Sequence, residues 1–357
     1  MAHHRSLVVL GLLVLSGLLV AAPRTALAGP QNWLYPAGPV AKMQLELFML
    51  TTYIMLFVFV VVSGLLIYAI VKFRDKGVAG VGVGRAAAEV AAGKEQDLPP
   101  QFEGDPRIEI VLTIIPFLLL LIMAIPTVNL NFALAAEPEG DVLEVRVVGH
   151  QWWWEFEYPQ LGIVTGNELR IPVGRPVKLY VETADVIHKF WVPRLAGKID
   201  LVPGRVNVTW FQADEPGVYY GQCAELCGTH HANMRLRVVA LPPEEFEQWV
   251  ANYGRGIVAD TPEQLAAAER GRQIFETRAC FACHTIEGTR AAGKVGPNLT
   301  DFGVRHTIGA GMMENTPENL ARWISDPQGV KPGSGMPRVA LSDSELADVV
   351  TFLLSLK

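Results

Sequence analysis

The strongest features of the hydrophobic pattern are two uncharged runs in the first part of the chain. Residues 47–71 and 110–136 contain no charged side chain. Each run exceeds the ~20 apolar residues that a helix needs to cross a bilayer. Pro116 and Pro126 lie inside the second run, and a membrane helix tolerates them. We therefore predict a hairpin of two transmembrane helices, at about 47–71 and 110–134, rather than two buried helices of a soluble protein.

Beyond the second run the pattern changes twice. Apolar and polar positions first alternate, as in VLEVRVVGH and RPVKLYVET, with Pro and Gly between the segments. This alternation predicts short strands in a β-sandwich or barrel. From Thr261 onward the period becomes helical, and Thr261 followed by Pro is a typical helix start. The sequence thus predicts a β domain at 137–241, a short helix and linker at 242–260, and a small α domain at 261–357.

The start of the chain resembles an export signal. Two histidines and an arginine precede residues 6–23, which carry no charge, and Ala26-Leu27-Ala28 follows shortly afterwards. We predict a signal peptide at 1–28, with a retained membrane helix as the alternative, and an N-terminal segment with the helix hairpin at 29–136. Basic residues gather between the two predicted membrane helices. The positive-inside rule therefore places that loop in the cytoplasm and the later domains on the outer face of a two-pass protein.

Composition indicates a membrane protein and argues against a nucleic-acid-binding one. Half of the residues are hydrophobic and 18% are charged, which agrees with membrane segments. The net charge is −6 and there is no basic stripe, so we expect no nucleic-acid partner. The four cysteines form two short pairs with cofactor spacing, so we expect no disulfide bonds.

The first cysteine pair lies in the segment CAELCGTHHANM. Cys223, Cys227, His231 and Met234 offer two thiolates, an imidazole and a thioether, which are soft donors that suit copper. A further imidazole is expected from His188, which lies at the end of an earlier strand. Two thiols in one loop can bridge two metal ions. A zinc site with two cysteines and two histidines is the weaker alternative.

Three segments, GHQWWW, DVIHKFWVPRLAGKIDLVPGR and YYGQCAELCGTHHANM, follow the predicted membrane helices. Together they resemble subunit II of haem–copper cytochrome c oxidases, over about residues 40–250. The resemblance implies a cupredoxin-like β-barrel with a dinuclear copper centre, CuA. Its ligands would be five side chains and one backbone carbonyl: His188, Cys223, Cys227, His231 and Met234, with the carbonyl of Glu225. His230, beside a ligand, is expected to be an exposed loop residue.

The same resemblance implies further roles. The Glu225 carboxylate would bind a magnesium ion at the interface with subunit I. Glu109 would lie at the mouth of a proton path into subunit I. Trp152 matches the exposed tryptophan through which the family accepts electrons from cytochrome c. Trp154 is expected to pack near the copper, and strand alternation would place Trp152 and Trp154 on one face.

The second cysteine pair belongs to the motif CFACH. C-x-x-C-H attaches a c-type haem through Cys280 and Cys283 and supplies His284 as the proximal iron ligand. A redox C-x-x-C or half of a zinc site is the weaker alternative. We predict Met336 as the second axial ligand, because it lies in a Gly/Pro loop just before the last helix. The other candidates are Met312, Met313 and His306.

The segment around this motif resembles class I cytochromes c, which are all-α domains. GPNL at 296–299 matches their loop on the proximal side of the haem, where the Pro297 carbonyl would orient the proximal histidine. A sulfur ligand raises the iron potential relative to two histidines, which suits an electron carrier.

A subunit II body fused to a cytochrome c resembles the caa-type oxidases. The fusion implies the electron-accepting subunit of a respiratory terminal oxidase in a bacterial plasma membrane. Electrons from a soluble or membrane cytochrome c would pass through haem c and CuA to haem a in subunit I. Oxygen reduction, coupled to proton translocation, would occur there, and subunit III is a further expected partner. No catalytic residue is expected in this chain, and its nearly neutral haem domain is expected to be held by its tether.

Two alternatives stay open at this point. One is a membrane-anchored electron-transfer protein with CuA and haem c that works outside any oxidase. The other is a copper-binding assembly factor, which would not need a haem. A quinol-oxidase subunit II is opposed by Cys223 and Cys227, because that branch lacks CuA.

Overall fold

The computed structural model describes residues 29–73 and 104–357. They form two compact units: Glu46–Ala133 in one, and the described residues up to Leu45 together with Leu134–Lys357 in the other. The predicted signal peptide and most of the predicted cytoplasmic loop lie outside the described residues.

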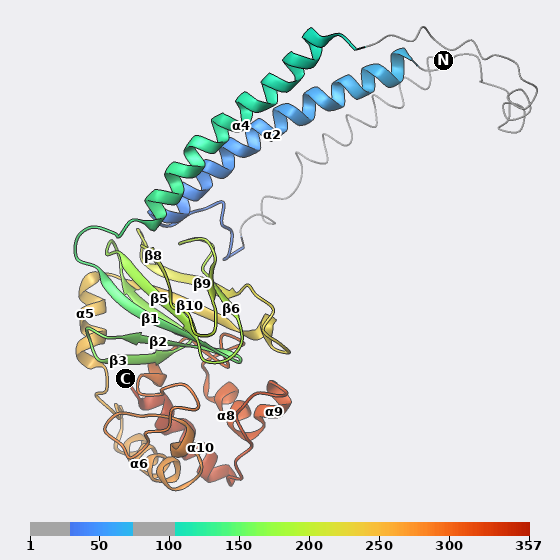
Figure 1. The fold of residues 1–357 in the computed structure, drawn as a ribbon. Helices are drawn as coiled ribbons and strands as arrows, with labels where there is room; N and C mark the ends of the chain where they lie inside the picture. The colour runs from blue at the N-terminus through green and yellow to red at the C-terminus, as the bar shows by residue number, and fades with distance from the viewer. Residues whose placement is uncertain (1–28, 74–103) are drawn as a thin grey trace, which may run out of the picture. The chain divides into compact units, whose positions relative to one another are not determined.

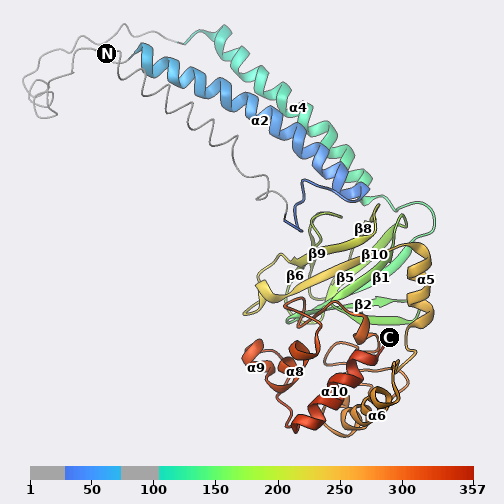
Figure 2. The ribbon, with the colours of Figure 1, turned by 180° about the vertical axis from the view of Figure 1, so that it is seen from behind.

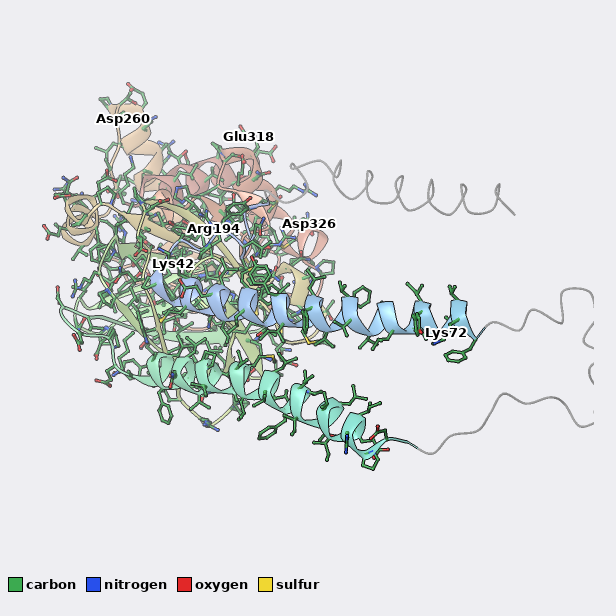
Figure 3. All side chains as sticks on the ribbon, turned by 90° about the horizontal axis from the view of Figure 1, so that it is seen from above. Lys42, Lys72, Arg194, Asp260, Glu318 and Asp326 are labelled. Atoms are coloured by element: carbon green, nitrogen blue, oxygen red, sulfur yellow. The ribbon has the colours of Figure 1, made fainter. Side chains whose placement is uncertain are left out.

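The structure contains the two long apolar helices that the first prediction requires. Helices α2 (Pro39–Lys72) and α4 (Pro106–Ala135) are long and apolar enough to cross a membrane. Apolar side chains surround α2 between Lys42 and Lys72 (Figure 3), and most of them are exposed, as lipid-facing side chains are. Helix α2 begins at Pro39, before the uncharged run that starts at residue 47, because no helix-breaking residue lies between them.

The β domain consists of two five-stranded sheets (Figure 1 and Figure 2). The first sheet has the order β3-β2-β1-β5-β8 and the second the order β4-β10-β9-β6-β7. The strands of the first sheet are β1 (Leu143–His150), β2 (Trp153–Tyr158), β3 (Ile163–Gly166), β5 (Val177–Thr183) and β8 (Asn207–Phe211). Those of the second are β4 (Glu168–Pro172), β6 (His188–Trp191), β7 (Ile199–Leu201), β9 (Gly217–Cys223) and β10 (Arg235–Leu241). Together they confirm the cupredoxin-like expectation.

The alternation seen in the sequence becomes the core of this domain. Strand β2 buries Trp154, Phe156 and Tyr158 on one face, while the residues between them stay partly exposed. Strand β1 pairs with β2 in antiparallel fashion and with β5 in parallel fashion. Burial of such alternating side chains contributes roughly 1.5–3 kcal/mol each. The two sheets thus form the frame from which residues 223–234 extend. We call this segment, which contains most of the predicted copper ligands, the copper loop.

Helix α5 (Pro243–Asn252) lies in the predicted linker but packs on the β domain. Its Phe246 and Trp249 belong to the same buried cluster as the strands. The Tyr253 hydroxyl lies 2.7 Å from the Val164 carbonyl oxygen, which ties the end of the helix to β3. This segment is therefore part of the body of the β domain.

The C-terminal domain is helical, as expected for a cytochrome c. Its helices are α6 (Pro262–Thr277), α7 (Cys280–Cys283), α8 (Pro317–Ser325), α9 (Pro327–Val330) and α10 (Asp343–Ser355), with the short η3 (Phe302–Val304) and the strands β11 (Thr307–Ile308) and β12 (Met313–Glu314). Thr261 caps α6, and Ser342 with Glu345 forms a capping box at α10. Helices α6 and α10 lie side by side, and a Cβ at Gly271 would lie 2.1 Å from the Asp348 carbonyl oxygen. Only glycine permits this approach.

Buried polar contacts join the two domains along β3 and β4. Glu168, only 1% exposed, accepts hydrogen bonds from the backbone N–H groups of His306 at 2.9 Å and Thr307 at 2.8 Å. Thr165 donates its hydroxyl proton to Asp301 at 3.0 Å, and Arg170 donates to the Val304 carbonyl at 2.5 Å. We call this set the β3–β4 strip: Thr165, Glu168 and Arg170 with Asp301, Val304, His306 and Thr307.

Candidate metal centres

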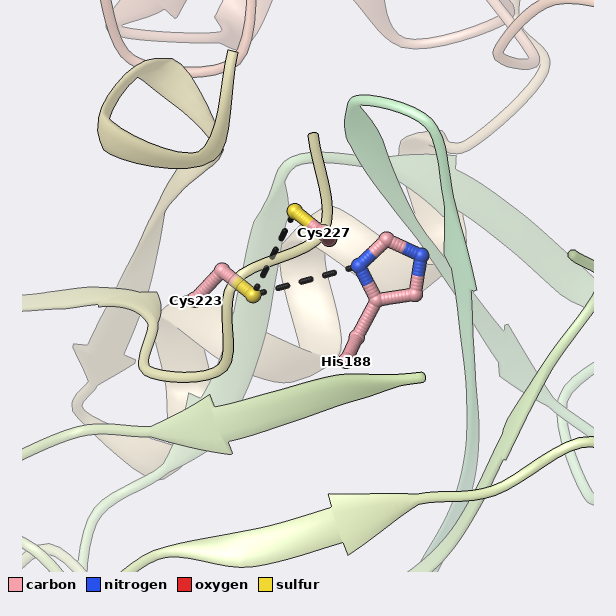
Figure 4. Close-up of side chains that lie close together, drawn as sticks. All are labelled: His188, Cys223 and Cys227. Carbon is pink, nitrogen blue, oxygen red and sulfur yellow. Dashed lines mark hydrogen bonds between the residues drawn. The ribbon is translucent and has the colours of Figure 1, made fainter. Parts of the chain in front are cut away.

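The structure brings the predicted copper ligands together at one end of the β domain. Cys223 Sγ lies 3.8 Å from both His188 Nδ1 and Cys227 Sγ (Figure 4). Cys227 Sγ lies 3.8 Å from both His231 Nδ1 and Met234 Sδ. The Glu225 carbonyl oxygen lies 3.2 Å from Cys223 Sγ. All six expected donor atoms therefore converge without rearrangement of the chain.

Local structure explains this convergence. Strand β9 ends at Cys223 and pairs with β6, which begins at His188, so adjacent strands supply the two donors. The loop then returns through the short helix η2 (His231–Asn233) to Met234. His188, Cys223, Cys227 and Met234 are all buried, which shields the centre from water.

The pKa values of the two thiols are shifted in opposite directions. The hydrogen bond that it shares with Cys227 lowers the pKa of Cys223 to about 3, although burial opposes the shift. The same hydrogen bond and burial raise the pKa of Cys227. Two thiolates this close repel each other, so a cation is needed before both sulfurs can be thiolates. Two sulfurs 3.8 Å apart can bind the same metal ion, since a metal–thiolate bond is about 2.3 Å. The donor set fits copper bridged by two thiolates.

Sequence reasoning missed Asp185, which orients a ligand. Its Oδ1 lies 2.8 Å from His188 Nε2, which leaves Nδ1 of that ring turned toward Cys223. Asp185 Oδ2 also accepts the Gln151 backbone N–H at 2.7 Å. Carboxylates often fix ligand imidazoles in this way. Asp185 lies three residues before His188 in the segment DVIH, and this spacing is the sequence signal that could have identified it.

Trp152 lies directly on the copper loop. Its indole Nε1 donates a hydrogen bond to the Cys227 carbonyl at 3.0 Å, and Gln151 Nε2 donates to the same oxygen at 2.7 Å. Strand β2 begins at Trp153, so Trp152 belongs to the preceding turn. Alternation along a strand therefore does not set its direction, contrary to our expectation. Trp154 is fully buried and packs edge-on against Phe190, 5.5 Å between ring centroids.

His230 and the Glu225 carboxylate, near the copper ligands, make contacts that the sequence did not predict. His230, expected to be exposed, is 6% exposed, and its Nε2 lies 2.6 Å from the Pro332 carbonyl oxygen of the haem domain. The Glu225 carboxylate lies 3.1 Å from Lys189 Nζ, and that ammonium also lies 3.1 Å from Asp200. A magnesium ion at Glu225 would thus share the carboxylate with a lysine.

The haem motif is arranged around His284. Helix α7 contains Cys280 and Cys283 on one turn, and His284 follows it. His284 Nδ1 lies 2.8 Å from the Pro297 carbonyl oxygen, which accepts its proton and leaves Nε2 free for iron. A Cβ at Gly296 would lie 2.6 Å from His284 Cε1, so the ring occupies the space that a side chain at this position would need. Burial lowers the pKa of His284, which favours the neutral imidazole that binds a metal.

Met336 and Cys280 border the same hydrophobic cluster of the haem domain. Met313 borders this cluster too, in the short strand β12, whereas Met336 lies in the loop before α10. Gln328 Nε2 donates to the Met336 carbonyl at 2.8 Å and holds that loop. His306 is directed elsewhere, since its Nδ1 lies 3.1 Å from Glu168. This set of residues fits a c-type haem with a sulfur ligand from the loop.

Two known families match separate parts of the chain. The periplasmic domain of cytochrome c oxidase subunit II matches residues 162–241, and cytochrome c matches residues 268–357. These families imply a CuA centre in the β domain and haem c in the helical domain. With the two apolar helices, they indicate a membrane-anchored protein with a periplasmic domain.

Individual relatives extend over more of the chain. It is 38% identical to cytochrome c oxidase subunit 2 of Alkalihalophilus pseudofirmus over 93% of each chain. It is 37% identical to cytochrome c oxidase subunit 2 of Bacillus sp. strain PS3 over 91% of each chain. The crystal structure of the periplasmic domain of subunit II of cytochrome oxidase of Bradyrhizobium japonicum is 37% identical, with a TM-score of 0.31, and covers 32% of this chain and 94% of its own. Because the identity to the two full-length relatives extends over nearly all of both chains, the protein is an oxidase subunit that belongs to the cytochrome c oxidase subunit 2 family.

Proposed function

We propose that this chain is the electron-accepting subunit of a respiratory terminal oxidase. It takes electrons from a soluble or membrane cytochrome c and delivers them toward haem a of subunit I, where oxygen is reduced and protons are translocated. The observation that carries the proposal is the 3.0 Å hydrogen bond from Trp152 Nε1 to the Cys227 carbonyl. It joins a half-buried indole to the backbone of a copper ligand, in a chain that also contains a c-type haem motif.

The residues of this chain hold and tune two redox groups. Copper and haem c, when bound, each supply one-electron transfer. His188, Cys223, Cys227, His231 and Met234 would hold copper together with the Glu225 carbonyl. Cys280, Cys283 and His284 would hold the haem, with Met336 as the axial sulfur ligand and Pro297 orienting the histidine.

Further roles concern the surroundings of the complex. Glu225 would bind magnesium at the boundary with subunit I, in competition with Lys189. Glu109 lies in the first turn of α4, where a proton path into subunit I could begin. The chain would span a bacterial plasma membrane twice, with subunits I and III as partners.

Replacement of a copper ligand tests the proposal. Cys227→Ser removes one bridging thiolate, so we expect loss of the near-infrared copper band while the haem spectrum is retained. Oxygen uptake with reduced cytochrome c should fall by roughly a hundredfold or more, because the acceptor centre is lost. Thr229→Ala, an exposed position of the same loop, should leave both unchanged.

Purification in mild detergent supplies the complementary test. The proposal requires a larger helical subunit to copurify with the chain in stoichiometric amount. Recovery of the chain alone, with both chromophores intact, would contradict an oxidase and favour an independent electron-transfer protein.

A further inference from the structure

Lys331 is a buried cation in an unusual setting. Only 3% of it is exposed, and lysine is almost never buried without partners. Its partners are backbone carbonyl oxygens: Trp152 at 2.8 Å, Asn233 at 3.1 Å and Gly309 at 3.3 Å. An ammonium group has three donors, so this arrangement uses all of them.

The three carbonyls belong to three separate segments of the chain. Trp152 contacts the Cys227 carbonyl, and Asn233 precedes the copper ligand Met234. Gly309 belongs to the haem domain, as does Lys331 itself. One ammonium group therefore joins the tryptophan turn, the copper loop and the haem domain.

The adjacent residue reinforces this junction. The Pro332 carbonyl oxygen lies 2.6 Å from His230 Nε2, which must be the donor because a carbonyl only accepts. The His230 ring lies edge-on to Trp152, 5.2 Å between centroids at 76°. We call this set the Trp152 strip: Trp152, His230 and Asn233 with Gly309, Lys331 and Pro332.

The loop from Lys331 to Met336 is held as one piece. Gln328 accepts the Gly333 backbone N–H at 2.9 Å and donates to the Ser334 and Met336 carbonyls, both at 2.8 Å. The Ser334 N–H donates to the Lys331 carbonyl at 3.0 Å. A displacement of Lys331 is therefore transmitted to the backbone of Met336.

We propose that Lys331 is a positioning residue that holds the Met336 loop of the haem domain against the Trp152 turn of the copper domain. Its ammonium sets the geometry between the axial-ligand loop and the indole that contacts Cys227. The inference rests on the proposed function, because it takes Trp152 as the route by which electrons reach the copper centre.

The variant Lys331→Met keeps an unbranched side chain, one atom shorter, and removes all three donors. In the purified oxidase, a photoexcited electron donor in solution gives one electron to the haem, and the rate is measured at which that electron leaves the haem and reduces the oxidised copper centre. We expect that rate to fall by roughly tenfold or more, since small misplacements are costly for pre-positioned groups. The copper band and the rate of the initial haem reduction should stay the same.

The matched control is Lys294→Met, which removes an exposed lysine of the same domain and should leave the rate unchanged. An unaltered rate in Lys331→Met would overturn the inference. If the wild-type oxidase shows no transfer from its haem to copper, the proposed function fails instead, so the two failures are distinct.

A measurement without any substitution covers the case in which the variant does not fold. The native full-length chain is treated with an amine-acetylating reagent, and each lysine is followed by mass spectrometry. Lys331 should react at least about tenfold more slowly than Lys294, because its amine is buried and fully hydrogen-bonded. Equal rates for the two lysines would show that the Trp152 strip does not form and would overturn the inference.

Discussion

The two strips that join the copper and haem domains differ in the buried charge at their centre, although Arg170 in the first also donates to a carbonyl. In the β3–β4 strip, buried carboxylates of Glu168 and Asp301 accept hydrogen bonds from backbone and hydroxyl donors. In the Trp152 strip, the buried ammonium of Lys331 donates to backbone carbonyls. A charged group that is buried in this way is costly unless its hydrogen bonds are complete, so both strips demand accurate docking.

The strips differ in what they contact. The β3–β4 strip joins two sheet strands to the segment 301–307 and includes none of the residues that we propose to hold copper or haem. The Trp152 strip includes residues adjacent to Met234 and on the loop of Met336. We infer that the first mainly anchors the haem domain, while the second mainly aligns it. The predictions below separate these two effects.

The largest effect is expected at Glu168. Glu168→Leu leaves the N–H groups of His306 and Thr307 without their acceptor in a buried place. The free energy of unfolding should fall by about 3–5 kcal/mol, the usual result when one partner of a buried charged network is removed. Urea titrations monitored by haem absorbance and by tryptophan fluorescence would measure it.

The smaller change Thr165→Val serves as the control for this prediction. It removes one hydrogen bond to Asp301 and should cost only about 1 kcal/mol. If Glu168→Leu were as mild as Thr165→Val, the β3–β4 strip would not be the main anchor.

Replacement of Trp152 should lower the free energy of unfolding less than replacement of Glu168. Its main effect is expected on the rate of electron transfer. Trp152→Gln removes the indole that donates to the Cys227 carbonyl, so transfer from haem to copper should slow by roughly tenfold. Pulsed photoreduction of the haem would measure the rate. Trp153→Gln is the matched control, because Trp153 stacks on His150 and has no bond to the copper loop. Equal slowing in both variants would argue for a general packing defect.

The mildest effect is expected from acid. Burial alone would raise the pKa of Glu168, but its hydrogen bonds with His306 and the charges of His306 and Arg170 outweigh burial and lower it. Arg237 also faces this carboxylate. The stabilisation is therefore complete above the ordinary glutamate pKa of 4.5 and is lost as the pH falls through the lowered folded-state pKa.

Acid thus acts on the β3–β4 strip through Glu168, whereas the Lys331 ammonium already carries its proton. Thermal unfolding midpoints measured from pH 7 downward should decline for the wild type below about pH 4.5. Glu168→Gln should show a flatter profile over the same range. A wild-type decline that Glu168→Gln fully retains would assign the acid sensitivity to other carboxylates.

Much of the fold and of the two metal sites could be predicted from the sequence because the signals are local. C-x-x-C-H contains three haem-binding residues in five positions, and CAELCGTHHANM contains most of the copper donors. Uncharged runs and alternating strands likewise depend on neighbouring positions. Among the copper donors, only His188 required a long-range inference, and the pairing of β6 with β9 brings it to Cys223.

Contacts between the domains could not be predicted, because no local pattern marks them. Lys331, His230 and Glu168 resemble ordinary polar residues in the sequence, and we expected a tether to hold the haem domain. Their burial depends on pairing with residues more than a hundred positions away along the chain. The strand register also escaped prediction, since a turn at Trp152 interrupts the alternation.

The pairing of Glu168 with the backbone at residues 306 and 307 has a consequence for protein engineering. A haem module cut out at the linker and grafted onto another copper domain would meet a surface without that acceptor. The donor copper domain would in turn expose an unsatisfied carboxylate. Chimeric oxidases should therefore exchange the β3–β4 segment together with the cytochrome, so that the unit of transplantation is an interface rather than a domain.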